Sequence, residues 1–148
     1  MCGITGIFSK TKNQLMSSDE LSVSLMNRVI KHRGPDYDEV KRVSDLCVLG
    51  HVRLSIIDVS SASNQPMTSS CGRYSLVYNG EIYNYLEIKN RLGLITKSSG
   101  DTEVLLEAIA KHGLSILSEI NGIFAFALYD SKRNTLSLAR DRFGVKPA

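Results

Sequence analysis

A cysteine stands directly after the initiator methionine, and no other residue of this chain suggests chemistry so directly by its position. Removal of Met1 would leave Cys2 with a thiol and a free α-amino group on one residue. An α-amino group titrates at about pH 7.7–8.0 and a free thiol at about 8.5, so each is partly in its reactive form at neutral pH. An N-terminal amine can activate the nucleophile of its own residue. Position 2 alone is a weak signal, because a cysteine there is usually incidental.

The other thiols and the imidazoles point to less chemistry. Cys47 and Cys71 are widely spaced and form no Cys-x-x-Cys pair, so neither a disulfide framework nor a zinc site is indicated. Cys47 lies in an apolar stretch and is expected to be a buried core thiol, whereas Cys71 lies in a polar turn. The histidines form no His-Glu-x-x-His motif and have no evident cysteine partner, which disfavours metal hydrolysis and a papain-like enzyme.

Composition narrows the class of protein. A chain of 148 residues with 43% hydrophobic content predicts one globular domain with a substantial core. The net charge is +3 and no Lys/Arg run occurs, so no nucleic-acid partner is expected. No segment approaches the roughly 18 apolar residues that span a membrane, and the N-terminus lacks the pattern of a signal peptide. We therefore expect a cytoplasmic protein with no membrane partner.

Apolar patterns predict the elements that would position the candidate side chains. A strand over residues 4–8 follows Cys2 directly, and residues 123–129 are apolar throughout, which predicts a strand covered on both faces. Asn79-Gly80-Glu81 is expected to break a strand that ends at Tyr78, because glycine permits a bend. The other expected elements are strands over 46–54, 74–78 and 135–139, and helices over 17–31, after Asn84, over 102–112 and over 114–119. Such a mixture suggests antiparallel sheets between helices.

Two helix starts are predicted from capping patterns. Ser17 with Glu20 three positions later forms a capping box. The helix that follows carries an apolar repeat at helical spacing, at Leu21, Leu25, Met26 and Val29. Asp101 is expected to cap the helix over 102–112, and Gly113 suits its C-terminal end.

Seven short motifs then occur along the chain in an order typical of one family. They are Met1-Cys2-Gly3-Ile4, His32-Arg33-Gly34-Pro35-Asp36, Arg53-Leu54-Ser55-Ile56-Ile57-Asp58, Asn64-Gln65-Pro66-Met67, Asn79-Gly80-Glu81-Ile82-Tyr83-Asn84, Ser99-Gly100-Asp101-Thr102-Glu103 and Arg140-Asp141-Arg142-Phe143-Gly144. Together they resemble the N-terminal type 2 glutamine amidotransferase domain of the glutamine-hydrolysing asparagine synthetases. The resemblance covers essentially the whole chain and favours this branch over the glucosamine-phosphate and purine branches.

The resemblance implies an α+β fold of the N-terminal nucleophile (Ntn) hydrolase type, a four-layer αββα sandwich with two antiparallel sheets between helices. Domains of this family usually continue past residue 148, so we expect 1–148 to be a glutaminase domain truncated at its C-terminus. The synthetase domain, which would use ATP and Mg, is absent from this chain. No cofactor or metal is expected in the glutaminase domain itself, and a homodimer is compatible with the family.

The resemblance also implies a reaction. Met1 is removed, and Cys2 attacks the side-chain amide of L-glutamine with its α-amino group as base. Ammonia leaves, and water releases glutamate from a γ-glutamyl thioester. The side-chain amide of Asn79 and the backbone N–H of Gly80 would stabilise the oxyanion.

Recognition of glutamine is implied by further matched positions. Arg53 would bind the α-carboxylate with its two-pronged guanidinium. Glu81 and Asp101 would bind the α-ammonium, and the backbone of Leu54 and Ile56 would line the pocket. Requiring both charged ends would help to exclude other amides.

Plainer interpretations stand beside these roles. Asp101 fits a simple helix cap, Arg53 a surface arginine, and Asn79-Gly80 a turn. Arg33, Asp36, Arg140 and Asp141 are expected to hold loops and domain contacts. The ammonia would go to aspartate in the parent enzyme. The alternatives are another acceptor, such as a sugar acid in surface polysaccharide biosynthesis, or a non-catalytic regulatory or docking domain of the same fold.

Overall fold

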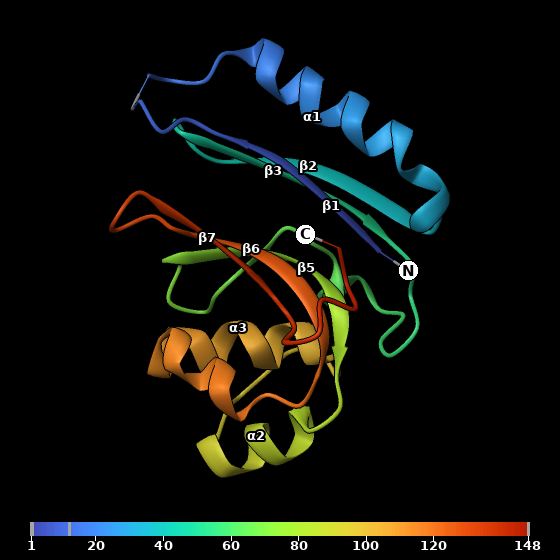
Figure 1. The fold of residues 1–148 in the computed structure, drawn as a ribbon, viewed down its shortest axis with the longest axis vertical. Coiled ribbons are helices and arrows are strands. Elements are labelled where there is room, and N and C mark those ends of the chain that lie inside the picture. Colours follow the sequence, from blue (N-terminus) through green and yellow to red (C-terminus); the bar gives the residue numbers. More distant parts are fainter. Residues whose placement is uncertain (1, 12, 148) are drawn as a thin grey trace.

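A computed structural model describes residues 2–11 and 13–147, and Figure 1 shows them as four layers. The outer helix α1 (Ser17–Val29) covers a sheet with strand order β1-β3-β2, formed by β1 (Gly3–Phe8), β3 (Cys47–Arg53) and β2 (Tyr37–Ser44). The second sheet has the order β4-β5-β6-β7, with β4 (Met67–Thr68), β5 (Tyr74–Ile82), β6 (Gly122–Asp130) and β7 (Thr135–Arg140). Helices α2 (Tyr85–Leu92) and α3 (Asp101–His112) form the last layer. Short 3₁₀ turns span Lys31–Arg33, Ser61–Ser63 and Leu114–Glu119.

Every pair of neighbouring strands in the two sheets is antiparallel, and the predicted αββα arrangement is confirmed. Strand β6 is buried from Phe124 to Asp130, as its unbroken apolar run predicted. Its side chains alternate between two cores, because successive residues of a strand face opposite ways. Phe126 packs toward α3, whereas Tyr129 packs between the sheets with Cys47. Burial there raises the pKa of the Cys47 thiol to about 12.

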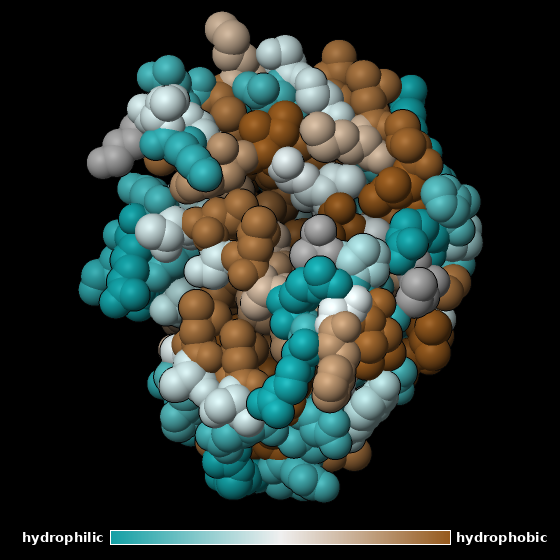
Figure 2. Space-filling view, in the orientation of Figure 1, coloured by the Kyte–Doolittle hydropathy of each residue, from teal (hydrophilic) through white to brown (hydrophobic). Residues whose placement is uncertain are grey.

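Helix α1 lies where the pattern predicted it, but its apolar repeat does not face the sheet. Leu21 and Val29 are 62% and 76% exposed, and Figure 2 shows apolar side chains along this outer helix. The inward residues are Val23 and Asn27. Asn27 accepts a hydrogen bond from Thr5 on β1 (2.6 Å) and donates to backbone carbonyls of β2 and β3. A polar anchor thus holds this helix on its sheet.

Three further details differ from the sequence predictions. The capping box lies one residue earlier, because Ser17 is already helical and the N–H of Met16 donates to Asp19 (2.7 Å). Strand β2 is not predicted by the apolar pattern, since it is a half-exposed edge strand rich in charged residues. Strand β5 runs through Asn79 and Gly80 to Ile82, so the prediction of a break there was wrong.

Candidate functional site

A pocket of about 210 Å³ opens where the two sheets meet, at the start of β1 and the end of β3. Because these strands are antiparallel, the residue before β1 lies beside the residue that ends β3. The end of β5 and the start of α3 form the opposite wall. All eight predicted site residues line this pocket: Cys2, Arg53, Leu54, Ile56, Asn79, Gly80, Glu81 and Asp101.

The Cys2 sulfur is partly exposed and is held against Leu54. The Leu54 N–H donates to the sulfur over 3.4 Å, and the thiol lies 3.6 Å from the Leu54 carbonyl oxygen. The carbonyl of Cys2 accepts a hydrogen bond from Nε of Arg33 (3.2 Å). Arg33 can reach it because Gly34 packs directly on β3, where an added Cβ would lie 2.4 Å from the Val52 carbonyl carbon. The predicted removal of Met1 concerns a residue outside the described ranges.

Backbone alternation decides where the N–H of Gly80 points. Gly80 pairs with Phe124 on β6. Phe124 directs its N–H and C=O away from β5, toward Asp141, with bonds of 3.1 and 2.7 Å. Both polar groups of a strand residue point to the same side, so Gly80 and Phe124 form a non-hydrogen-bonded pair. The N–H of Gly80 therefore points away from β6.

That free side of β5 is the pocket edge, because β4 covers it only at Leu76 and Ser75. The neighbours of the same parity are satisfied by side chains. The Tyr78 N–H donates to Gln65 (2.6 Å), and the Ile82 N–H donates to Asp101 (2.9 Å). Gly80 lies between them with its N–H aimed at the same edge, which is the orientation that an oxyanion donor needs.

Glycine is required at position 80 for packing rather than for a turn. An added Cβ would lie 2.5 Å from the Ile123 carbonyl oxygen and 2.7 Å from the Phe124 Cα. The interpretation of Asn79-Gly80 as a simple turn is therefore wrong. Asn79 is 4% exposed and faces the opposite side of the sheet from Gly80, as does Glu81.

The Arg53 guanidinium is 6% exposed and organises the loop after β3. It donates to the carbonyl of Ser60 (2.8 Å), to the side chain of Asn64 (2.6 Å) and to the carbonyl of Asp58. These bonds use three of the five N–H groups that a guanidinium carries, so two remain for a ligand. The alternative of a surface arginine does not fit this burial.

Asp101 is the first residue of α3 rather than its cap, which is Gly100. The predicted cap is wrong because the carboxylate is used elsewhere. Its Oδ2 accepts hydrogen bonds from the Tyr78 hydroxyl (2.7 Å) and from the Ile82 N–H (2.9 Å). Burial raises the pKa of Asp101, while these donors and the N–H groups that begin α3 oppose the rise. A buried carboxylate thus joins the oxyanion strand to the helix that closes the pocket.

The sequence comparisons agree with this geometry. The family model of the glutamine amidotransferase domain matches residues 1–148. The chain belongs to this family. Glutamine-hydrolysing asparagine synthetase 3 of Bacillus subtilis is 39% identical over 152 residues, which cover 99% of this chain and 24% of that protein. Glutamine-hydrolysing asparagine synthetase B of Escherichia coli is 36% identical over 150 residues, which cover 99% of this chain and 26% of that protein.

A solved structure shows the same fold in a more distant protein. Glutamine phosphoribosylpyrophosphate amidotransferase from Bacillus subtilis superposes with a TM-score of 0.75 at 20% identity, covering 97% of this chain and 38% of that one. This likeness identifies the sandwich as the Ntn-hydrolase type. The amidotransferase domain described here spans about a quarter of the length of the two curated synthetases.

Several residues of the amidotransferase pocket were not predicted to belong to it. Gln65 and Tyr78 line it next to predicted residues, and Lys146 enters it from the C-terminal segment. Asp58 joins two pocket loops, because it accepts hydrogen bonds from the N–H groups of Ser60 (2.7 Å) and Ser99 (2.8 Å). The bonds from Ser60, followed by that from Ser99, lower the pKa of Asp58. Asp58 and Gln65 lie inside recognised motifs, but a motif does not reveal which way a side chain points.

Within residues 2–11 and 13–147, no three His, Cys, Asp or Glu side chains are grouped so as to hold a metal ion. The same residues form no helix that is long and apolar enough to cross a membrane. His51 lies near the pocket without contacting Cys2, since its Nε2 bonds to the carbonyl of Tyr78 (3.2 Å).

Proposed function

We propose that this domain hydrolyses the side-chain amide of glutamine with Cys2 as the nucleophile. The observation that carries the proposal is the convergence of three groups on one pocket. These are the Cys2 thiol, the Gly80 N–H at the open edge of β5, and the buried Asp101 carboxylate. A nucleophile, an oxyanion donor and an anion for the substrate amine are what an amide hydrolase for an amino acid requires.

In the proposed reaction the Cys2 sulfur forms a bond to the amide carbon of glutamine, and its proton passes to the free α-amino group of the processed N-terminus. The side-chain amide of Asn79 and the Gly80 N–H stabilise the oxyanion. The carbon–nitrogen bond then breaks, and the proton leaves with the nitrogen as ammonia. Water cleaves the resulting γ-glutamyl thioester, which restores the thiol and releases glutamate.

Recognition of the amino-acid end follows from charge. The two remaining N–H groups of Arg53 suit the α-carboxylate of glutamine. Asp101 and Glu81 supply negative charge for the α-ammonium, and backbone groups of Leu54 and Ile56 complete the wall. A site that holds both charged ends would reject amides lacking either, because its own buried polar groups would stay unpaired.

We further propose that the ammonia amidates aspartate elsewhere in the parent enzyme, with ATP and Mg used there. The support is that the relatives compared above are named asparagine synthetases. Another acceptor, such as a sugar acid, would leave this pocket unchanged, so the pocket itself favours no acceptor. We expect the protein to act in the cytoplasm.

The test is the intact mass of the protein before and after treatment with a diazoketone analogue of glutamine. We expect a mass without Met1 and one adduct that maps to Cys2. Cys2→Ala should form no adduct and release no glutamate from glutamine. Retained Met1 in a folded sample, or an adduct that survives Cys2→Ala, would contradict the proposal and favour a non-catalytic docking domain.

Cys71 provides the matched control thiol. It is exposed, and its hydrogen bond with the Ser69 hydroxyl (3.3 Å), together with one to the backbone of Arg73, lowers its pKa. A simple alkylating agent is therefore expected to label Cys71. Cys71→Ala should abolish that labelling and leave the glutamine-analogue adduct intact.

A further inference from the structure

We infer that Tyr78 is a positioning residue that holds Asp101 as the carboxylate selecting substrates with an α-ammonium group. The inference rests on the proposed function and adds to it a residue that sets specificity. Tyr78 precedes the oxyanion residues Asn79 and Gly80 on β5, so one strand segment would serve both ends of the substrate.

All three polar groups of Tyr78 are bonded to different parts of the pocket. Its N–H donates to Gln65 (2.6 Å), and its carbonyl accepts from His51 on β3 (3.2 Å). Its hydroxyl donates to Asp101 on α3 (2.7 Å). Tyr78 is 2% exposed, so none of these bonds competes freely with water. The residue therefore fixes β5 to the nucleophile's sheet and α3 to β5 at once.

The hydroxyl of Tyr78 matters most because of what it bonds to. Asp101 is buried, and burial disfavours its charged form. Two strong donors from β5 meet on the same carboxylate oxygen, the Tyr78 hydroxyl and the Ile82 N–H. Hydrogen bonds to a carboxylate favour the charged form and shorten its range of orientations. Loss of the hydroxyl would leave Asp101 with a weaker hold and a smaller ionised fraction.

Other charges share the pocket with Asp101 and would act on it in both the native protein and a variant. Glu81 comes from β5, Arg53 from β3, Asp58 from the loop after β3, and Lys146 from the C-terminal segment. On α3 itself the nearest acid is Glu103, whose carboxylate is bonded to the backbone N–H groups of residues 97 and 98. None of these side chains loses a partner when the Tyr78 hydroxyl is removed.

The experiment compares two amides in Tyr78→Phe. Glutaramic acid keeps the amide and carboxylate of glutamine but lacks its α-amino group. We expect kcat/KM for glutamine to fall about tenfold through KM, the order of a lost hydrogen bond to a charged acceptor. Turnover of glutaramic acid should stay within about twofold of the native rate. The acidic limb of kcat/KM for glutamine should move up by about one pH unit, which is the shift equivalent to that tenfold change.

Tyr129→Phe is the matched control, because Tyr129 is equally buried on the neighbouring strand and its hydroxyl makes one bond of similar length, to Asn134 (2.8 Å). It should cost similar stability and leave both substrates and the pH profile unchanged. Equal losses for glutamine and glutaramic acid in Tyr78→Phe, or an unmoved acidic limb, would overturn the inference.

A second variant covers the case in which Tyr78→Phe does not fold. Asp101→Asn should lose the same preference for glutamine over glutaramic acid, and an unchanged preference would overturn the inference as well. Failure of the proposed function has a different signature, since the native protein would then hydrolyse neither amide and form no Cys2 adduct.

Discussion

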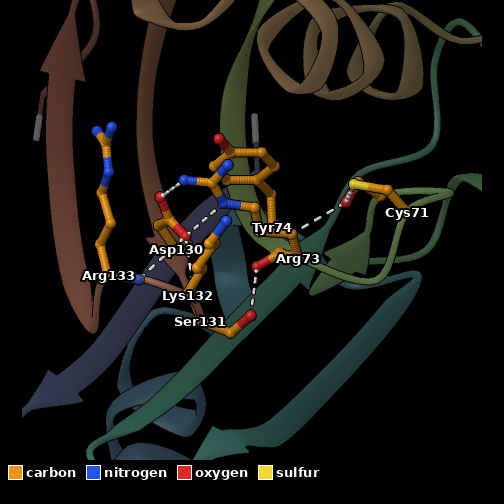
Figure 3. Close-up of polar contacts among 8 residues, drawn as sticks. Cys71, Arg73, Tyr74, Asp130, Ser131, Lys132 and Arg133 are labelled. Carbon is orange, nitrogen blue, oxygen red and sulfur yellow. Dashed lines mark hydrogen bonds and ion pairs between the residues drawn. The ribbon is translucent and has the colours of Figure 1, made fainter.

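The two ends of the strand pair β5–β6 use polar residues in opposite ways. At one end, which we call the hairpin end, Arg73 on β5 forms a two-pronged ion pair with Asp130 on β6, over 2.8 and 2.6 Å. The turn after Asp130 folds back onto it, because the N–H of Lys132 donates to the same carboxylate (3.0 Å) and Ser131 donates to the Arg73 carbonyl (2.9 Å). Figure 3 shows these groups turned toward one another.

At the other end, which we call the pocket end, the polar groups of Tyr78–Ile82 reach outward. Their partners come from β3, from the loop before β4 and from α3. These bonds tie four separate segments around a cavity, whereas those of the hairpin end close one local turn. The comparison indicates that the same pair of strands gains stability at one end and holds a preorganised site at the other.

The largest difference between the ends is expected for glycine substitutions. Gly80→Ala would force a Cβ to 2.5 Å from the Ile123 carbonyl oxygen, and overpacking of this kind costs about 3 kcal/mol of unfolding free energy. Displacing the oxyanion N–H should also lower kcat for glutamine about 10²-fold. Denaturant unfolding and glutamate release measure the two effects.

Gly72→Ala is the control at the hairpin end. Gly72 has φ of +73° and no atom within 4 Å of an added Cβ, so the change costs only backbone strain of about 1 kcal/mol. Its glutaminase activity should equal that of the native protein. Native turnover in a folded Gly80→Ala variant would refute the assignment of an oxyanion donor to this strand.

Acid is expected to weaken the pocket end first. Burial is the main reason that the pKa of His51 falls from 6.5 to about 4 in the folded protein. Between these values the unfolded chain binds a proton that the folded chain does not. Stability is therefore lost as pH drops from about 6.5 to about 4, by up to about 3 kcal/mol. Unfolding free energies at pH 7 and 4.5 should show this loss.

His51→Gln separates this titration from the acidic groups, because an amide can still donate to the Tyr78 carbonyl but does not titrate. The variant should lose less stability than the native protein over the same interval. An identical pH dependence in both proteins would mean that His51 is not the group responsible.

Much of the fold could be predicted from sequence because its main signals are local. The apolar run of β6 required cover on both faces, and the motif order pointed to the αββα sandwich. The positions of β2 and the inward face of α1 could not be predicted in this way. Charged residues on β2 hide an edge strand, and Asn27 is buried on three bonds to strands far away in sequence.

The candidate site divides along the same line. The residue types of Cys2, Arg53 and Asp101 suggested a pocket, and all three line it. The direction of the Gly80 N–H could not be predicted, since it depends on Phe124 turning its polar groups toward Asp141. The role of Tyr78 was equally hidden, because its three partners lie on three other segments.

The smallest effect is expected from the ion pair of the hairpin end. Arg73 holds the pKa of Asp130 below its usual range, so this pair adds stability above about pH 4 that is lost as pH falls further. Asp130→Asn keeps the shape but removes the charge, and because the pair is partly exposed we expect Tm at pH 7 to fall by only about 3 °C. The KM for glutamine should not change, since Asp130 lies at the far end of β6 from Gly80. A raised KM would show that the two ends are coupled, and a Tm unchanged between the native protein and the variant would show that the ion pair adds nothing to stability.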